Sequence, residues 1–487
     1  MIEENVNIHG RFQFELKQVF PFSRRNRRYD AYNVDTYLFL PASLHTNEDT
    51  YPREIFYRNL KTYIRLRTPT YSLTELAENL DPVQRLQESM HLLSREVANP
   101  RFQANYDYQL KLFCLIMKRS LRLAVAELAA GGGADEQRVA LFCRRVKTIT
   151  AAFRELDGRY EGFDRQGSSG QLFRLADEFI SCRVELYSCK LLAGESGVQL
   201  SAGAAGRLSA LIEAETGYRR KRGYPSQAEV GTNNESFLYR QAMLKKTVSN
   251  VLYLETRKQQ AGILVRHILL GVAAGMAMLF ATGVAFYWQN KYGALSFPLF
   301  LALVLGYILK DRMKDFLQVY FSRTLRHLFW DRKRTVFHSG GRRIGRLREH
   351  MGFVEQKALP PAIRTIRQAS RPSASYGAFD EEVLCYRKQV RLASRRFRRV
   401  AKRYVTEGML DITRLNIERF LHSMDAPRKT VYLLAQGACR PEKGDRVYHI
   451  NMVQHYYNDE EESFRHFRIV LNRRGIKRIE PVAGPTA

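Results

Sequence analysis

Acidic residues and cysteines are both scarce in this sequence. The chain of 487 residues holds 49 Asp and Glu against 78 Lys and Arg, which gives a formal net charge of +29. A surplus of this size makes polyanions the expected partners, either anionic lipid headgroups or nucleic acid. The six cysteines form no CxxC pair and no zinc-ligand spacing. Neither a zinc module nor a disulfide framework is therefore expected in a reducing cytoplasm.

Motifs that carry a known chemistry are also absent from the sequence. It contains no GxxxxGK(S/T) phosphate loop, no HExxH zinc helix, no GxSxG nucleophile elbow and no GxGxxG after a strand. His449 and His455 share a face of one expected strand, and we place His466 on the opposite face of the next strand. We therefore assign no catalytic residue, no metal site and no cofactor, and we favour a protein that is not an enzyme.

Long uncharged runs occur in one region of the chain only. No residue is charged from Ile268 to Gln289 or from Tyr292 to Leu309. As helices these runs would measure roughly 33 Å and roughly 27 Å, against about 30 Å for the hydrocarbon core of a bilayer. Tyr287, Trp288 and Tyr292 cluster at the turn, as in an interfacial aromatic belt. The pattern predicts a two-helix transmembrane hairpin; the alternative is a helix pair buried in a soluble core.

The positions of Lys and Arg around these runs predict the orientation of the hairpin. Lys and Arg are frequent before Ile268 and after Leu309, whereas the turn holds only Lys291. Because cytoplasmic flanks carry the excess of Lys and Arg, we expect both termini on the cytoplasmic side of the cell inner (plasma) membrane.

Small residues recur along the first apolar run. Gly271 and Gly275 form a GxxxG motif, and Ala277, Ala281 and Ala285 form a second row at steps of four. Such rows let helices approach closely. We expect them to pack either the two helices of one hairpin or two copies of the chain in a homo-oligomer.

The periodicity of apolar residues divides the rest of the chain. Alternating Phe12, Phe14 and Leu16 predict strands near the N-terminus, and a similar alternation follows Arg446. The expected segments are an N-terminal β segment (1–50), a cytoplasmic helical domain (51–235), a stalk with the hairpin (236–340), a basic segment and linker (341–379), and a basic amphipathic helix with a β meander (380–487).

These segments predict the fold class. We expect an α+β membrane protein with a helical bundle, a two-helix transmembrane hairpin on a cytoplasmic stalk, and an antiparallel β module. The stalk is expected because no Pro or Gly interrupts the chain between Ser236 and Gly262. Three C-terminal strands alone would be marginally stable, so the N-terminal strands are expected to pair with them.

A basic helix is predicted after Asp380. Tyr386, Val390, Ala393 and Phe397 recur at steps of three or four. The cations between them are the candidate contacts for lipid or another polyanion: Arg387, Lys388, Arg391, Arg395, Arg396, Arg398, Arg399, Lys402 and Arg403. Three interpretations stay open, namely a helix docked on the final domain with a solvated basic back, a helix on the membrane surface, and a nucleic-acid contact.

The sequence as a whole favours a positioning role at the membrane. We expect a membrane-anchored scaffold or signalling component on the cytoplasmic face, without its own catalytic site, with a basic surface on anionic lipid and a protein partner of unknown identity. The alternatives are a membrane-tethered nucleic-acid-binding protein and an enzyme whose catalytic residues are dispersed along the chain.

Overall fold

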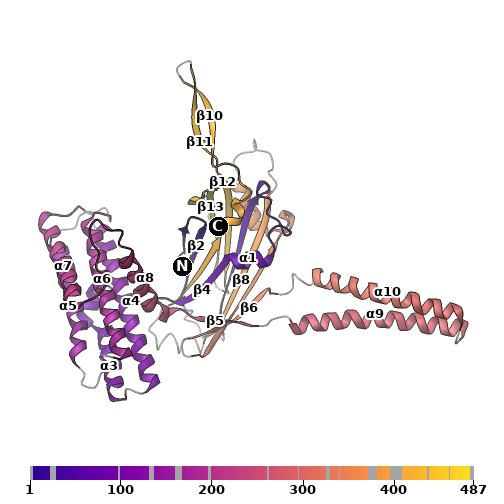
Figure 1. Cartoon of the computed structure of the whole chain (residues 1–487), viewed down its shortest axis with the longest axis horizontal. Helices are drawn as coiled ribbons and strands as arrows, with labels where there is room; N and C mark the ends of the chain where they lie inside the picture. The colour runs from indigo at the N-terminus through magenta and orange to yellow at the C-terminus, as the bar shows by residue number, and fades with distance from the viewer. Residues whose placement is uncertain are drawn as a thin grey trace. The chain divides into compact units, whose positions relative to one another are not determined.

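The computed structural model describes most of the chain (Figure 1). The described residues are 4–21, 29–96, 99–130, 136–159, 167–195, 199–259, 263–293, 296–324, 330–338, 341–370, 381–394, 408–435, 438–459 and 461–482. The chain forms two compact units. We call them the sheet unit (Met1–Tyr63, Leu254–Val400 and Asp411–Ala487) and the helical unit (Ile64–Tyr253 and Ala401–Leu410).

The sheet unit is built on an antiparallel sheet with strand order β14-β13-β12-β3-β8-β7-β6-β5. Its strands are β3 (Tyr29–Pro41), β5 (Glu255–Gln259), β6 (Arg332–Phe337), β7 (Arg343–Phe353), β8 (Glu381–Ala393), β12 (Tyr448–Tyr457), β13 (Glu462–Asn472) and β14 (Gly475–Pro481). β12 pairs with β3, which places Met452 opposite Leu38. The expectation that both ends of the chain build one antiparallel β module is confirmed.

A second sheet, with order β1-β2-β9-β4, packs against the first. Its strands are β1 (Glu4–Gly10), β2 (Gln13–Pro21), β9 (Gly408–Asn416) and β4 (Leu60–Leu66). Phe14 and Leu16 of β2 and Leu415 of β9 share one buried cluster with Leu38 of β3 and Leu384 of β8. The short helices α1 (Arg53–Asn59) and α13 (Glu418–Leu421) add further residues to this core. The inner face of the large sheet from β14 to β7 thus forms the core of the unit.

The outer face of the large sheet is covered at one place by α11 (Pro361–Ala369). Ile363 of this helix and the preceding Leu359 pack on Phe39, Val383 and Val453. A two-stranded hairpin of β10 (Arg428–Ala435) and β11 (Ala438–Asp445) also belongs to this unit, and its residues are mostly exposed (Figure 1).

The helical unit is a helical bundle, as expected. Its helices are α2 (Leu73–Asn79), α3 (Asp81–Arg95), α4 (Pro100–Ala130), α5 (Glu136–Arg159), α6 (Ser168–Leu192), α7 (Ala202–Lys221) and α8 (Glu235–Ser249). Ser72 and Glu75 form a capping box that starts α2. Stacked rings of Phe113, Phe153 and Phe173 lie in the core of the bundle.

Two long helices, α9 (Ile263–Tyr292) and α10 (Phe297–Thr324), form an antiparallel hairpin between β5 and β6 (Figure 1). The expected stalk is wrong for the first helix, because α8 ends at Ser249 and the chain then enters strand β5. Residues of β5 pair with β6, for example Arg257 with Thr335. The stalk was predicted because no Pro or Gly interrupts this segment. Hydrogen bonding to β6 nevertheless makes residues 255–259 a strand, since tertiary contacts outweigh local helix propensity. The second helix does continue beyond Leu309, to Thr324.

The basic helix expected after Asp380 is also wrong, since Glu381–Ala393 is strand β8 in the interior of the sheet. Its apolar residues fit both periods, because Leu384, Tyr386, Val390 and Leu392 also share one face of a strand. Lys388 interrupts the alternation of apolar and polar residues in the sequence. The helical period therefore fitted the sequence better than the period of a strand. Hydrogen bonding to β3 on one edge and to β7 on the other makes this segment a strand.

The boundaries of two further segments differ from the expectation. The helical domain expected from residue 51 begins later, because Leu60–Leu66 is strand β4. The basic segment expected within 341–379 contains strand β7, so its cations belong to the sheet and not to a linker.

Candidate functional site

The inner surface of the α9–α10 hairpin is made of small side chains. Ala273 and Ala277 of α9 and Ala302 of α10 are buried. A Cβ atom at Gly306 of α10 would lie 3.7 Å from the Val284 side chain of α9. Without larger side chains between them, the two helices approach closely.

The candidate packing residues divide between the two surfaces of α9. Ala277 is buried against α10, and Ala281 and Ala285 are half-buried, so the alanine row packs inside the hairpin. Gly271 and Gly275 are exposed, and among the described residues no atom lies within 4 Å of a Cβ built at either position. The GxxxG motif is therefore not used within one hairpin.

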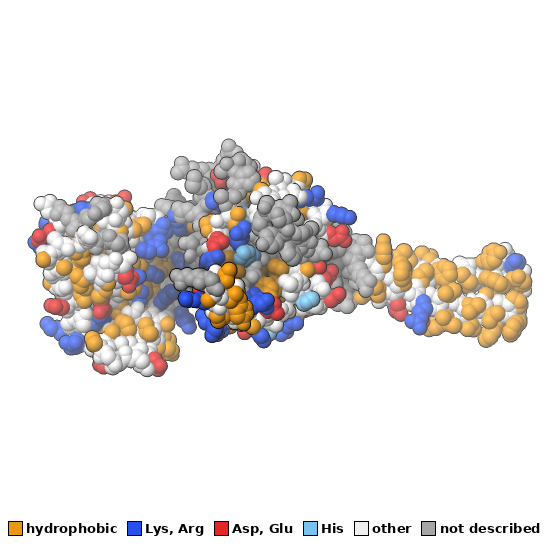
Figure 2. Space-filling model, turned by 90° about the horizontal axis from the view of Figure 1, so that it is seen from above, with side chains coloured by type: hydrophobic (Ala, Val, Ile, Leu, Met, Phe, Trp, Pro, Cys, Tyr) orange, Lys and Arg blue, Asp and Glu red, His pale blue; other side chains and the backbone are white. Residues whose placement is uncertain are grey.

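The outer surface of the hairpin is hydrophobic on both helices. Figure 2 shows hydrophobic side chains over most of this elongated part of the molecule. The exposed large hydrophobic residues of α9 and α10 are Ile268, Val272, Met276, Met278, Leu279, Phe280, Phe286, Tyr287, Tyr292, Phe297, Phe300, Leu301, Leu303, Val304, Leu305, Tyr307, Ile308, Leu309, Phe316, Val319 and Tyr320. A contiguous apolar surface of this kind marks a contact with lipid or with another protein.

Within the described residues, one helical segment has the length and composition needed to cross a membrane. It is Leu270–Tyr292, with a mean hydropathy of 1.7. The second expected span, Tyr292–Leu309, is not helical throughout. α9 ends at Tyr292, Gly293 has a φ of 79°, and α10 begins only at Phe297. The uncharged helical part of α10 therefore measures about 20 Å.

The second notable surface is a set of cations on the outer face of the large sheet. Residues opposite each other on neighbouring strands share a face of a sheet. Arg391 of β8 lies opposite Arg346 of β7, and Arg346 lies opposite Thr335 of β6. Thr335 in turn lies opposite Arg257 of β5. Three arginines thus stand in one row across four strands.

The adjacent rows add three further cations. Arg348 of β7 lies opposite Lys333 of β6, and Arg387 of β8 lies opposite His350 of β7. All these side chains are exposed or half-buried. We call them the basic face: Arg257, Lys333, Arg346, Arg348, Arg387 and Arg391.

Few carboxylates lie close enough to the basic face to neutralise its positive charges. Arg257 pairs with Glu255 at 2.7 Å, and the Arg387 guanidinium lies 4.0 Å from Asp35. Within the part of the chain that the structure describes, the other four cations of the face have no ion pair. Partial burial and the positive charges of Arg391 and Arg346 lower the pKa of Arg348. Like charges held this close are stabilised by a bound anion.

The structure separates the nine predicted contact residues into three groups. Arg387 and Arg391 belong to the basic face. Lys388 points to the opposite face, is 2% exposed, and pairs with Asp411 at 2.5 Å. A lysine held in this way cannot contact lipid or nucleic acid, so that prediction is wrong. The remaining candidates lie outside the described residues: Arg395, Arg396, Arg398, Arg399, Lys402 and Arg403.

Lys388 belongs to a buried polar network between the two sheets. Its Nζ also lies 3.3 Å from the Thr413 hydroxyl, and the Tyr32 hydroxyl donates to Asp411 at 3.0 Å. Burial and the Asp411 charge raise the pKa of Tyr32 well above its usual value. The network neutralises a lysine in a core position, so its role is structural.

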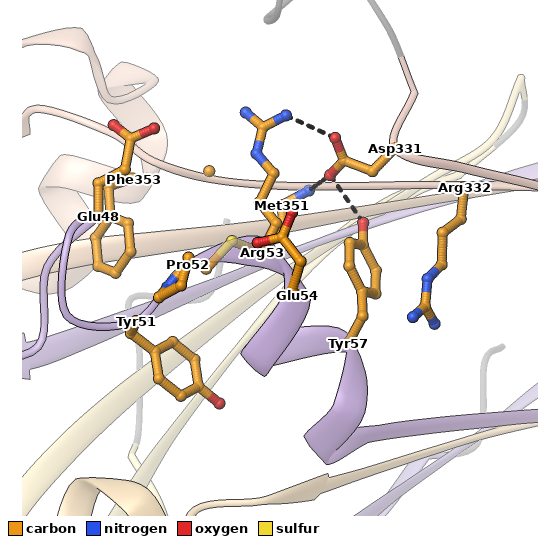
Figure 3. A pocket seen from close by; sticks show the side chains of 11 residues that line it. Glu48, Tyr51, Pro52, Arg53, Glu54, Tyr57, Asp331, Arg332, Met351 and Phe353 are labelled. Atoms are coloured by element: carbon orange, nitrogen blue, oxygen red, sulfur yellow. Dashed lines mark hydrogen bonds and ion pairs between the residues drawn. The ribbon is translucent and has the colours of Figure 1, made fainter. Parts of the chain in front are cut away.

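A pocket of about 460 Å³ lies beside the strand that follows the hairpin (Figure 3). At its centre Asp331 accepts hydrogen bonds from Arg53 at 2.7 Å, from the Tyr57 hydroxyl at 2.9 Å and from the Met351 amide at 2.7 Å. Burial alone would raise the pKa of Asp331, but His350, the Met351 amide and Arg53 outweigh it and lower the pKa.

The chemistry of this pocket is that of a fixed ion pair. Asp331 is held as an anion by its donors, and Arg332 stacks on the Tyr57 ring at 4.1 Å. The described lining residues include no Ser, Cys or His. The arrangement ties the chain after the hairpin to α1 and β7.

The three candidate histidines, His449, His455 and His466, do not form a common site. His466 lies opposite Val453, so it shares the face of His449 and His455, and the expectation that it lies on the other face is wrong. His466 is buried beside Asn451, whereas His455 pairs with Glu462. Among the described residues no group of His, Cys, Asp or Glu is arranged to hold a metal ion.

No family model, curated protein or solved structure matches this chain. Functional conclusions therefore depend on the two surfaces themselves, the apolar hairpin and the basic face. The sequence indicated the hairpin by its uncharged runs. Most of the basic face was missed, although Arg346, Leu347 and Arg348 alternate as a strand with one cationic side would.

Proposed function

We propose that this protein is an integral protein of the cell inner (plasma) membrane, anchored by the α9–α10 hairpin, with both termini on the cytoplasmic side. The observation that carries the proposal is the outward-facing apolar surface of both helices. Transfer of one such side chain out of water is worth about 1.5–3 kcal/mol. More than twenty large hydrophobic side chains exposed on one hairpin would be unfavourable in water and suit an apolar environment.

On the cytoplasmic side the protein would act as a scaffold or signalling component without its own catalytic site, with the basic face directed to anionic headgroups. β5 leads into α9, and α10 leads back into β6. Arg257 and Lys333 therefore lie on the two strands that enter and leave the hairpin. Each Lys or Arg close to an anionic membrane surface contributes about 1 kcal/mol.

Vesicle flotation tests the lipid contact. In a full chain with residues 263–324 replaced by a short Gly-Ser link, the basic face alone should bind vesicles containing anionic lipid and not purely zwitterionic vesicles. Replacement of Arg346 and Arg391 by Gln should weaken this binding at least fivefold, because two cations of the face are lost.

The matched control removes the same charge from the helical unit. Arg144→Gln with Lys147→Gln changes two exposed cations of α5 and should leave flotation unchanged. Equal flotation of the two double variants, or no binding to anionic vesicles at physiological salt, would reject the role of the basic face.

A membrane-tethered nucleic-acid-binding protein is the second candidate, favoured by the same basic face, four of whose six cations have no ion pair among the described residues. Phosphate contacts by these cations would release counterions, so binding would fall steeply with salt. Because vesicle binding also falls with salt, direct competition decides. Duplex DNA that displaces the hairpin-replaced chain from anionic vesicles at equal phosphate concentration would favour nucleic acid over lipid.

A further inference from the structure

The two helices of the hairpin differ in where their charges lie. α9 is uncharged from Ile268 to Gln289, whereas α10 becomes charged after Leu309. We call the charged positions of α10 the charge belt: Lys310, Asp311, Arg312, Lys314 and Asp315. Most of the belt is exposed; the Asp311 side chain, for example, is 53% accessible.

The charge belt lies beside the middle of the apolar run of α9. The helices run antiparallel, and Gly306 of α10 faces Val284 of α9. Both helices rise by the same amount per residue, so four residues onward along α10 correspond to four residues backward along α9. Lys310 is therefore level with Phe280. A membrane that covered the whole apolar run of α9 would also cover the belt.

The direction of the belt side chains excludes an easy escape to the cytoplasm. In a helix, side chains tilt toward the N-terminus, and the N-terminus of α10 is at the hairpin turn. Lys310 follows this rule, because its Nζ lies 4.0 Å from the ring of Tyr307, one turn closer to the hairpin turn. Charges buried in the membrane at this level would point deeper into it, where the burial of a charged side chain is most costly.

We infer that the hairpin enters the membrane only as far as the charge belt allows and does not cross it. The embedded part is then α9 from about Phe280 and α10 from Phe297 to Leu309, about 20 Å deep, against about 30 Å of hydrocarbon. This inference rests on the proposed membrane anchoring and defines its geometry. The turn stays inside the bilayer with one cation, Lys291, which costs less than burial of the five belt charges.

The position of Trp288 distinguishes partial insertion from full crossing. By the same register Trp288 is level with Ala302, about 12 Å from Lys310 along the helix axis. Partial insertion places this indole close to the bilayer midplane. Full crossing would place it at the far interface, where Trp is usually found in spanning helices.

The experiment uses the full chain with Trp330→Phe, which leaves Trp288 as the single tryptophan of the two in the sequence. The protein is reconstituted in vesicles whose lipids carry bromine either near the ends of the acyl chains or near the headgroups. We expect quenching of Trp288 by the deep bromines to exceed quenching by the shallow ones at least twofold. Stronger quenching by the shallow bromines would overturn partial insertion while leaving the anchor intact. Equal absence of quenching would overturn the anchor itself.

Two variants test whether the charge belt sets the depth. K310L/D311L/R312L/K314L/D315L removes the whole charge belt and extends the uncharged part of α10 to Ser322, about 39 Å and more than the hydrocarbon thickness. Trp288 can then reach the far interface, so the main quenching should move to the shallow bromines. K314L/D315L removes two charges but keeps Lys310 as the first one, so the quenching ratio should not change. An unchanged ratio in the first variant would contradict the inference. W288F, which retains Trp330 outside the hairpin, should show no quenching and verifies that the signal comes from Trp288.

Discussion

At the scale of single residues, Lys388 shows how a charge in a sequence can be misjudged. Nine cations were expected on one surface, but Lys388 lies in the core with its ammonium on Asp411. The sequence gives no local sign of this, because Asp411 comes from a distant strand. Arg387 and Arg391, by contrast, were correctly expected to be accessible, since both side chains are exposed on the outer face of the sheet.

Removal of one partner from this buried pair should be costly. Asp411→Ala leaves the Lys388 ammonium buried without its counter-ion and should lower the free energy of unfolding of the sheet unit by about 3–5 kcal/mol. The double variant Lys388→Met with Asp411→Leu should recover most of this loss. Asp425→Ala, which breaks the exposed pair with Arg446, should cost less than about 1 kcal/mol. Urea unfolding measures all three, and equal effects of Asp411→Ala and Asp425→Ala would contradict the core position of the pair.

His466 should make the stability of the sheet unit depend on pH. Burial, together with the charges of Arg367 and Arg468, lowers its pKa from 6.5 to about 4. Between these two values the unfolded chain binds a proton that the folded chain does not. Stability should therefore fall as the pH drops from 6.5 toward 4, and His466→Gln should reduce this loss.

The same pH series on a surface histidine provides the control. His422 is exposed, so His422→Gln should keep the full pH dependence in urea unfolding between pH 7 and pH 4. An identical pH dependence in the His466→Gln variant and the parent chain would show that His466 is not buried in its neutral form.

At the scale of elements, the sequence predicted those whose pattern fits one period. The meander of β12, β13 and β14 and the α9–α10 hairpin are present, because strict alternation and long uncharged runs each have one structural solution. β8 was misjudged because its apolar residues fit two periods, and pairing with β3 and β7 decided between them. The stalk failed for a related reason, since β5 has almost no apolar residue and gains its order from β6.

The candidate surfaces were predictable to different degrees. Uncharged runs located the hairpin, whereas the length of its second apolar helix depended on the turn, which the sequence did not define. The basic face combines β5, β6, β7 and β8, and only the register of these strands brings Arg257, Lys333, Arg346 and Arg391 together. Information of this kind resides in long-range pairing and not in local spacing.

At the scale of the whole molecule, the proposal assigns different tasks to different parts of one chain. The hairpin would fix the protein in lipid, the basic face would hold the sheet unit against anionic headgroups, and the helical unit would remain for a protein partner. GxxxG residues Gly271 and Gly275, which face away from α10, leave room for a second copy on the part of the hairpin next to the sheet unit, outside the embedded segment. Each task depends on the hairpin being in the membrane.

Alkaline carbonate washing of membranes from cells that express the full chain tests that condition most directly. This treatment releases proteins held by charge alone, so the basic face would not retain the chain. We predict that the full chain stays in the membrane pellet, and that the chain with residues 263–324 replaced by a Gly-Ser link is released. Release of the full chain into the carbonate supernatant would contradict the account.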